Sequence, residues 1–273
     1  MGKFDGLLIC SDLDGTLLRN DKSVSEENLN AIEHFEREGG LFTFITGRMP
    51  FFVEDIYNTV RPNAPIGCIN GGGIYDYRKQ KYLWTRELAR DALALVEYAD
   101  RSIPGLGIQV NTFDKIYFSR ENEAMVYFRE ATGMPNLVAH YWDVHEPIAK
   151  IVFGDTREDA ILELQALLNN HPLAYRFDFI RSEKMLYEIL PKGVSKGSVL
   201  LKMAELLGID PRCTIGIGDY NNDIELLRVA GLGVAVANAR PEVKAIADHV
   251  TVSNESHAIA RIIMNLENGD FPL

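Results

Sequence analysis

The chain has 273 residues, with 28 Lys and Arg against 39 Asp and Glu, which gives a net charge of −11. Its 47% hydrophobic and 25% charged residues are typical of a folded globular protein. The negative charge argues against binding to nucleic acid or to an anionic membrane surface. The three cysteines lie far apart, so we expect no disulfide framework, no zinc site and a cytoplasmic location. No apolar run approaches the roughly 18 residues of a membrane span.

Short apolar runs recur in the first and last thirds of the chain, and helical patterns separate most of them. We expect strands at 7–10, 41–45, 65–69, 213–217, 232–237 and 249–252. We expect helices after the cap residue Ser25 and at 196–207, 222–230 and 241–247. Strands rich in Ile, Leu and Val that alternate with helices predict an α/β fold, a Rossmann-like parallel-sheet core with helices on both faces.

The middle of the chain has a different pattern. A helix at 86–101, a hairpin pair, a helix at 121–131, a strand at 149–153, a helix at 157–169 and two further strands follow in the order αββαβαββ. This order predicts a compact α+β domain with antiparallel strands, inserted into the α/β domain. We expect the core to comprise residues 1–83 and 188–273 and the inserted cap domain to comprise 84–187.

Polar residues follow directly after four of the expected strands. Ligands of open α/β sheets bind beyond the carboxyl ends of the strands, where such residues meet. The four strand ends contribute Asp12 and Asp14; Thr46, Gly47 and Arg48; Asn70; and Asp219, Asn222 and Asp223. One such end could be an ordinary turn, but four together predict a functional site along this edge of the sheet.

The carboxylates among these residues point to phosphoryl chemistry. Asp12, Asp14 and Asp219 would repel one another unless a cation lies among them. Their oxygens suit Mg²⁺, which keeps water molecules and binds the phosphate oxygens of a substrate. Beside such an ion one aspartate can attack phosphorus, and a second, two residues on, can act as general acid and base. Groups suited to the phosphoryl oxygens and their charge are Thr46, the Gly47 N–H and Lys196.

Four segments in order resemble the motifs of the haloacid dehalogenase-like superfamily. They are DLDGTLL at 12–18, ITGR at 45–48, PKGVSKGSVL at 191–200 and IGDYNND at 217–223. The stretch VAVANARPEVKAIADHVT at 234–251 resembles the C-terminal part of the same group. The resemblance spans nearly the whole chain. Within the superfamily the chain is similar to the Cof-type phosphatases, which carry a large cap after the second motif. The resemblance implies that the inserted domain is such a cap and sets substrate selectivity.

The resemblance also implies a role for each motif residue. Asp12 is the nucleophile, and Asp14 is the general acid and base. The Mg²⁺ ligands are Asp12, Asp14 through its backbone carbonyl, Asp219, and Asp223, which binds directly or through water and supports the lysine. The residues implied to contact phosphate or substrate are Thr46, Gly47, Arg48, Asn70, Lys196 and Asn222. An aspartate at position 14 favours ester hydrolysis, because related transport ATPases carry threonine there.

The expected function is Mg²⁺-dependent hydrolysis of a small phosphorylated metabolite, a sugar phosphate, through an aspartyl-phosphate. A phosphomutase resembling phosphomannomutases remains an alternative, as does a non-catalytic module that binds phosphorylated ligands. A third alternative is a phosphatase for pyridoxal phosphate or flavin mononucleotide, with Tyr141 or Trp142 stacked on the ring. We expect a monomer or a homodimer. We also expect the cap to close over the site by moving about hinges near residues 84 and 187.

Overall fold

The computed structural model describes residues 2–271, and the chain divides into two compact units. The first unit extends to Thr85 and resumes at Ser195, and the second consists of Arg86–Val194. The sequence places the second border near 187, but residues 186–191 form a strand that pairs within the second unit. Within residues 2–271 no helix is both long and apolar enough to span a bilayer.

The main sheet of the first unit is parallel, with the strand order β14-β13-β12-β1-β2. Its strands are β1 (Leu8–Ser11), β2 (Leu41–Phe44), β12 (Thr214–Gly218), β13 (Leu232–Ala235) and β14 (His249–Val250). Strands β1, β12 and β13 are buried along their whole length, which explains why the sequence shows continuous apolar runs there. The predicted parallel α/β core is confirmed.

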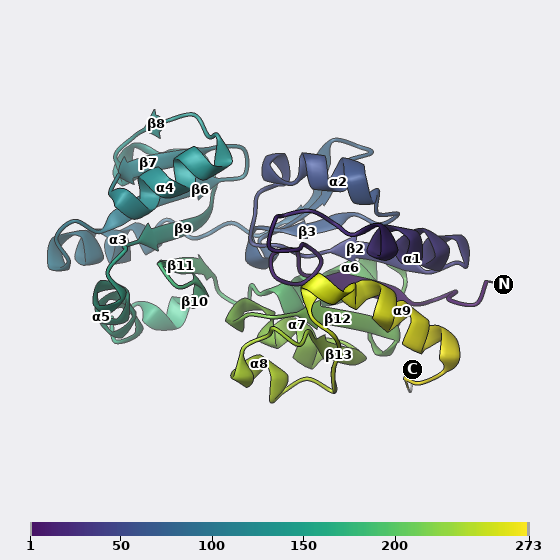
Figure 1. The fold of residues 1–273 in the computed structure, drawn as a ribbon. Helices are drawn as coiled ribbons and strands as arrows, with labels where there is room; N and C mark the ends of the chain where they lie inside the picture. Colours follow the sequence, from purple (N-terminus) through teal and green to yellow (C-terminus); the bar gives the residue numbers. More distant parts are fainter. Residues whose placement is uncertain (1, 272–273) are drawn as a thin grey trace. The chain divides into compact units, whose positions relative to one another are not determined.

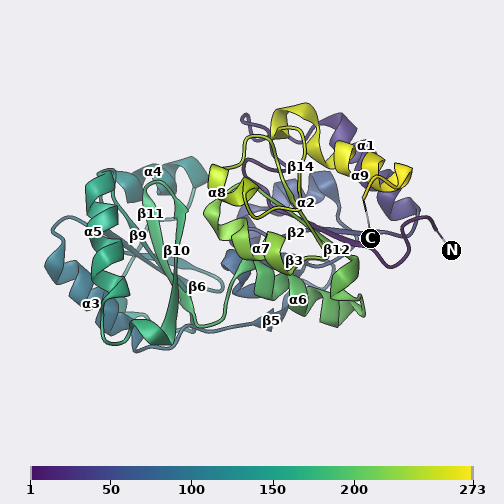
Figure 2. The same ribbon diagram turned by 90° about the horizontal axis from the view of Figure 1, so that it is seen from below.

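Helices cover both faces of this sheet, as Figure 2 shows. The helices of the unit are α1 (Glu26–Arg37), α2 (Glu54–Val60), α6 (Lys196–Leu207), α7 (Ile224–Val229), α8 (Pro241–Lys244) and α9 (Ala258–Asn268). Helices α1 and α9 lie side by side on one face, and α6 and α7 lie together on the other. Ser25 caps α1 as expected, and a Ser195–Ser198 capping box begins α6. The capping box fixes the first helical residue of α6, Lys196.

A small antiparallel sheet follows β2, and the sequence predicts only the first of its strands. It contains β3 (Ile66–Cys68), β4 (Gly73–Asp76) and β5 (Lys81–Thr85). The expected strand at 65–69 therefore pairs with β4, and one parallel bridge between Ile45 and Gly67 links it to the end of β2. The aromatic residues at 75–84 carry the β-strand signal for the other two strands.

The second unit is built on one mixed six-stranded sheet with the order β10-β11-β9-β6-β7-β8 (Figure 1). Its strands are β6 (Gly107–Thr112), β7 (Ile116–Arg120), β8 (Leu137–Val138), β9 (Ile148–Gly154), β10 (Phe177–Glu183) and β11 (Leu186–Pro191). Its helices are α3 (Ala92–Ser102), α4 (Glu123–Thr132) and α5 (Glu158–Asn169). Helix α3 begins later than predicted because the segment before it bonds to β9 instead, with Leu88 N–H donating to the Ile148 carbonyl.

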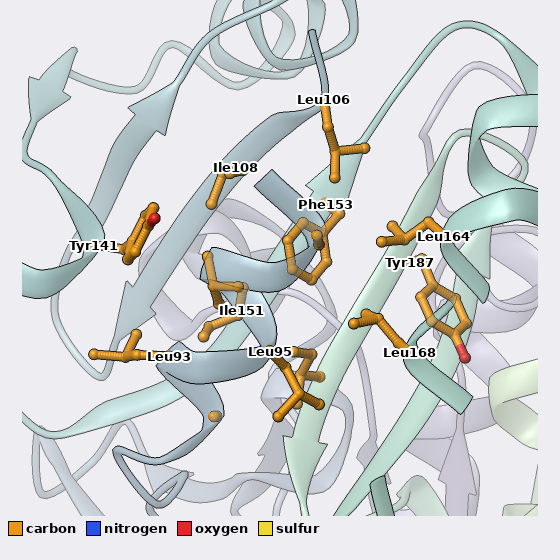
Figure 3. Close-up of a cluster of buried hydrophobic side chains, with 14 of the residues drawn as sticks. Leu93, Leu95, Leu106, Ile108, Tyr141, Ile151, Phe153, Leu164, Leu168 and Tyr187 are labelled. Carbon is orange, nitrogen blue, oxygen red and sulfur yellow. The ribbon is translucent and has the colours of Figure 1, made fainter. Parts of the chain in front are cut away.

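The two faces of this sheet differ in chemistry. Figure 3 shows Ile108, Ile151 and Phe153 packed against α3 and α5 in the hydrophobic core of the unit. Side chains alternate along a strand, so the neighbours of these residues on β6 and β9 point to the opposite face of the sheet. Helix α4 lies over one end of that face, where a Cβ on Gly107 or Gly154 would meet the side chain of Met125. A surface hollow of about 520 Å³ in this unit, lined by residues of α3 and α5, contains none of the predicted site residues.

The core of the second unit gives a stability prediction. Leu168 on α5 is fully buried in the cluster of Figure 3, so Leu168→Ala should lower the free energy of unfolding by about 2–5 kcal/mol. Leu162 on the same helix is 50% exposed, and Leu162→Ala should change it by only about 0.5 kcal/mol. Denaturant titration followed by circular dichroism measures both. Equal losses for the two variants would contradict the packing described.

Candidate active site

The centre of the site is a buried ammonium group between two carboxylates. Lys196 Nζ donates to Oδ1 of Asp12 and to Oδ1 of Asp223, each at 2.5 Å. Lys196 is 1% exposed, Asp12 5% and Asp223 0%. A lysine in the first turn of a helix usually lies in solvent, so the burial of Lys196 supports its predicted place in the site. Buried charges persist in proteins when they are paired and hydrogen-bonded, as they are here.

Short loops after the strands bring these groups together. Asp12 follows β1 directly, and its N–H donates to the Ile217 carbonyl on the neighbouring β12. The loop after β12 folds back so that Oδ2 of Asp223 accepts the backbone N–H groups of Asp219 and Tyr220, each at 2.9 Å. Both oxygens of Asp223 are therefore already engaged by donors of the protein.

Asp219 completes an acidic group with Asp12 and Asp223. Each of the three carboxylates offers one oxygen, and these oxygens lie within 4.8 Å of one another. Thr16 donates its hydroxyl to Oδ1 of Asp219 at 3.0 Å. Among residues 2–271, Lys196 is the one cation bonded to this group, and three carboxylates with one ammonium leave an excess of negative charge.

The pKa values of these groups reflect that excess. Burial raises the pKa of Asp12 well above its usual range, and the charge of Asp223 adds to the effect against Lys196. Burial and then Asp223 raise the pKa of Asp219 to about 7. Burial alone would lower the pKa of Lys196, but Asp12 and Asp223 outweigh it and raise that pKa. The acidic group thus favours one more positive charge.

These residues fit a hard divalent cation. Every donor atom in the group is a carboxylate oxygen, and Mg²⁺ prefers oxygen ligands with only one or two carboxylates and retained water. Asp12 and Asp219 have raised pKa values that a cation would reverse, and they are the residues suited to hold it. The engaged oxygens of Asp223 fit a role through Lys196 and a coordinated water better than direct ligation.

Asp14 lies in a contrasting, cationic environment. Arg48 binds it through two parallel hydrogen bonds, from Nε to Oδ2 at 2.8 Å and from Nη2 to Oδ1 at 2.6 Å. Lys22 Nζ donates to Oδ1 at 2.8 Å. Burial acts to raise the pKa of Asp14, but the Arg48 hydrogen bonds and charge, followed by those of Lys22, bring it below its usual value. Arg48, predicted to contact substrate, binds Asp14 in this structure.

The remaining predicted residues form a polar segment beside these groups. Asn222 donates through Nδ2 to Oδ1 of Asn70 at 3.1 Å, and Asn70 N–H donates to the Thr46 carbonyl at 3.0 Å. The Thr46 hydroxyl accepts the backbone N–H of Arg48 at 3.2 Å. Asn70 has a left-handed backbone (φ 52°). A Cβ on Gly47 would lie 2.8 Å from Oδ1 of Asn70, so a side chain at position 47 would displace the Asn70 amide.

Three residues that sequence reasoning missed also contribute. Thr16, whose hydroxyl donates to Asp219, lies within the first motif and could have been found there. Asn238 donates to the Gly15 carbonyl at 2.7 Å and holds the loop between Asp12 and Thr16. Asn238 lies in the C-terminal stretch that resembles the family, whereas no sequence signal marks Lys22.

A family model for haloacid dehalogenase-like hydrolases matches residues 9–263, so the chain belongs to this family. The predicted Cof-type membership and the enzyme class, a phosphatase of this family, are confirmed.

Two curated relatives of Bacillus subtilis illustrate this similarity. The chain is 27% identical to the 5-amino-6-(5-phospho-D-ribitylamino)uracil phosphatase YitU, over 94% of this chain and 96% of that protein. It is 28% identical to the phosphatase YwpJ, over 95% of this chain and 99% of that protein. A solved haloacid dehalogenase-like hydrolase from B. subtilis superposes with a TM-score of 0.80 at 27% identity, covering 95% of this chain and 99% of that one.

Gly15 offers a test of how tightly the site is packed. It has φ +79°, and a Cβ there would lie 2.6 Å from Oδ2 of Asp219. We expect Gly15→Ala to lower phosphatase turnover about 100-fold, because small displacements at a reacting centre are costly. Gly6→Ala is the matched control, since Gly6 has φ +86° with no atom within 4 Å of a Cβ.

Both variants should lose about 1–2 kcal/mol of stability from the left-handed backbone, measured by thermal unfolding. Turnover is measured as phosphate release from p-nitrophenyl phosphate. A loss of turnover that is equal in the two variants would show that backbone strain, rather than the contact with Asp219, is responsible.

Proposed function

We propose that the chain is a Mg²⁺-dependent phosphatase for a small phosphorylated metabolite and acts through an aspartyl-phosphate on Asp12. The observation that carries this proposal is the Lys196 ammonium between Asp12 and Asp223. It occupies Oδ1 of Asp12 and so leaves Oδ2 as the candidate attacking atom. A buried aspartate with one oxygen fixed by a cation is held in one orientation, which suits its other oxygen to attack phosphorus.

The proposed reaction has two steps. In the first, Oδ2 of Asp12 forms a bond to phosphorus, the bond from phosphorus to the alcohol oxygen breaks, and the Asp14 carboxyl group supplies the proton that the alcohol takes. In the second, Asp14 accepts a proton from water as the water oxygen bonds to phosphorus, which releases inorganic phosphate and restores the Asp12 carboxylate. Lys196 stays paired with Asp12 and offsets the charge that develops on the phosphoryl oxygens.

Asp12 and Asp219 would hold the metal ion, with the backbone carbonyl of Asp14 as a further oxygen. Bound Mg²⁺ supplies positive charge against the phosphoryl oxygens and the carboxylates. The excess of carboxylates over ammonium groups in the acidic group supports this assignment.

The nucleophile is tested by Asp12→Asn. An amide oxygen is a poor nucleophile toward phosphorus, so kcat on p-nitrophenyl phosphate should fall by about 10³-fold or more. The variant should remain folded by circular dichroism, because Asn keeps the shape of the side chain and can still accept from Lys196. Wild-type turnover in this variant would contradict the assignment of Asp12.

The metal is tested by chelation and replacement. Removal of divalent ions should abolish turnover, and Mg²⁺ should restore it. Ca²⁺ should restore little, since its looser coordination and longer bonds to oxygen misplace the attacking carboxylate. Phosphate release is measured at each ion concentration, with Asp12→Asn as the blank. Full activity after exhaustive chelation would contradict a metal-dependent mechanism.

We propose a hydroxyl-rich substrate beyond its phosphate, a sugar or sugar-alcohol phosphate. Support comes from the polar side of the sheet in the second unit, where Gln109 and Asn111 are 5% and 3% exposed. Oδ1 of Asn111 is buried without a hydrogen-bond partner among the described residues. Lys150 Nζ, on the adjacent strand, donates to Oε2 of Glu188 at 2.8 Å, so this face carries amides and a neutralised ion pair.

Two further observations support the same substrate class. The substrate in the name of YitU contains a phosphorylated ribityl chain, which is a sugar alcohol. The alternative of aromatic stacking loses one of its two candidates, because Tyr141 is 5% exposed and belongs to the hydrophobic core shown in Figure 3. Trp142 remains 41% exposed.

A substrate panel tests this class. Sugar and sugar-alcohol phosphates should give a higher kcat/KM than pyridoxal phosphate or flavin mononucleotide, with free phosphate as product rather than an isomeric phosphate. Asn111→Leu should lower kcat/KM on the best of them about tenfold while p-nitrophenyl phosphate is unaffected, because one hydrogen bond to a hydroxyl is lost. Preference for pyridoxal phosphate would favour the stacking alternative.

A further inference from the structure

Lys22 is a cation of the site that the function proposed above has not used. Its ammonium donates to Oδ1 of Asp14 at 2.8 Å, the same oxygen that accepts from Nη2 of Arg48 at 2.6 Å. The Arg48 fork sets the plane of the carboxylate, as bidentate pairs do. The hydrogen bond from Lys22, the third to this carboxylate, restrains rotation of that plane about the Cβ–Cγ bond. The Asp14 carboxylate is therefore oriented by two separate side chains.

The backbone that carries Lys22 is unusual. Lys22 has φ +66°, a left-handed conformation that glycine adopts freely and lysine seldom does. A tight turn imposes it, with Arg19 N–H donating to the Ser23 carbonyl and Lys22 N–H to the Arg19 carbonyl, each at 2.9 Å. Asp21 closes the turn by accepting from the N–H and hydroxyl of Ser23. Local geometry alone favours glycine or asparagine at this position.

The side chain of Lys22 is also exposed, and exposed ion pairs contribute little to stability. A lysine held in a left-handed backbone for a weak surface pair has no evident benefit to folding. The benefit lies in the group that it contacts, since Asp14 is the proposed proton donor and acceptor. Proton transfer requires the donor oxygen within hydrogen-bond reach of the leaving oxygen and aligned with it.

We propose that Lys22 is a positioning residue for Asp14, which aligns this carboxyl group for proton transfer to the leaving alcohol. This inference rests on the proposed function. It adds a residue outside the four motifs, from the turn that follows the first motif.

The experiment measures kcat/KM for a series of aryl and alkyl phosphates whose leaving alcohols differ in acidity. Poor leaving groups need the proton most, so misalignment of Asp14 makes log kcat/KM depend more steeply on the pKa of the leaving alcohol. For Lys22→Gly we expect about a tenfold loss on alkyl phosphates and less than about a threefold loss on p-nitrophenyl phosphate. Lys22→Gly relieves the backbone conformation, so its thermal stability should equal or exceed that of the wild type.

Arg61→Gly is the matched control, because Arg61 is also an exposed cation in the left-handed conformation (φ 54°) and bonds to the Asn58 carbonyl rather than to Asp14. This control should leave the slope unchanged. Lys22→Arg should keep most of the wild-type slope. In an Asp14→Asn background, Lys22→Gly should have no further effect on the slope, since the group that it orients is gone.

The outcomes separate the two proposals. A wild-type enzyme that hydrolyses the series, with the same slope in Lys22→Gly, overturns the role of Lys22 and leaves the phosphatase intact. An equal loss on all leaving groups in Lys22→Gly also overturns it, because a general loss of active protein moves the line without changing its slope. A wild-type protein that releases no phosphate from any member overturns the proposed function itself, and the role of Lys22 with it.

Discussion

The pairing of the Lys196 ammonium with Asp12 and Asp223 is the interaction on which the site depends. It joins the end of β1, the start of α6 and the loop after β12, which are far apart in the sequence. All three charges are buried, so removal of the Lys196 ammonium leaves the two carboxylates uncompensated at a cost of about 3–5 kcal/mol. The backbone N–H groups that bind Asp223 and the Ser195 capping box then fix where these charges lie.

Local positive charge matters in this protein because the whole chain is strongly acidic. A phosphorylated metabolite approaches a molecule with a net charge of −11, so the attraction must come from the immediate surroundings of the site. The positive charge of Lys196 is largely neutralised by the two carboxylates that it contacts. Arg48 and Lys22 supply further positive charge, which Asp14 accepts. The proposed divalent cation in the acidic group would therefore serve substrate binding as well as the chemistry.

Much of this arrangement could be predicted from the sequence, for definite reasons. Apolar runs followed by Asp12, Thr46 and Asp219 mark the buried parallel strands and their carboxyl ends, because both features are local. The sequence could not show that β3 turns away to pair with β4, since a three-residue strand has too little pattern to choose its partner. It could not show that Lys22 reaches Asp14 either, because that contact depends on a left-handed turn with no glycine to signal it.

Asp14 and Asp219 lie in environments of opposite sign, and this separates their roles. Both oxygens of Asp14 accept from cations, so its side chain has no electrostatic need for a metal ion. Asp219 has only a hydroxyl donor and lies beside two other carboxylates, which raises its pKa to about 7. Pairs of carboxyl groups driven apart in pKa by their surroundings are how one site supports both charge binding and proton transfer. Asp219, the group short of positive charge, is the one suited to hold the ion, and Asp14, already paired with Arg48 and Lys22, has no need of it.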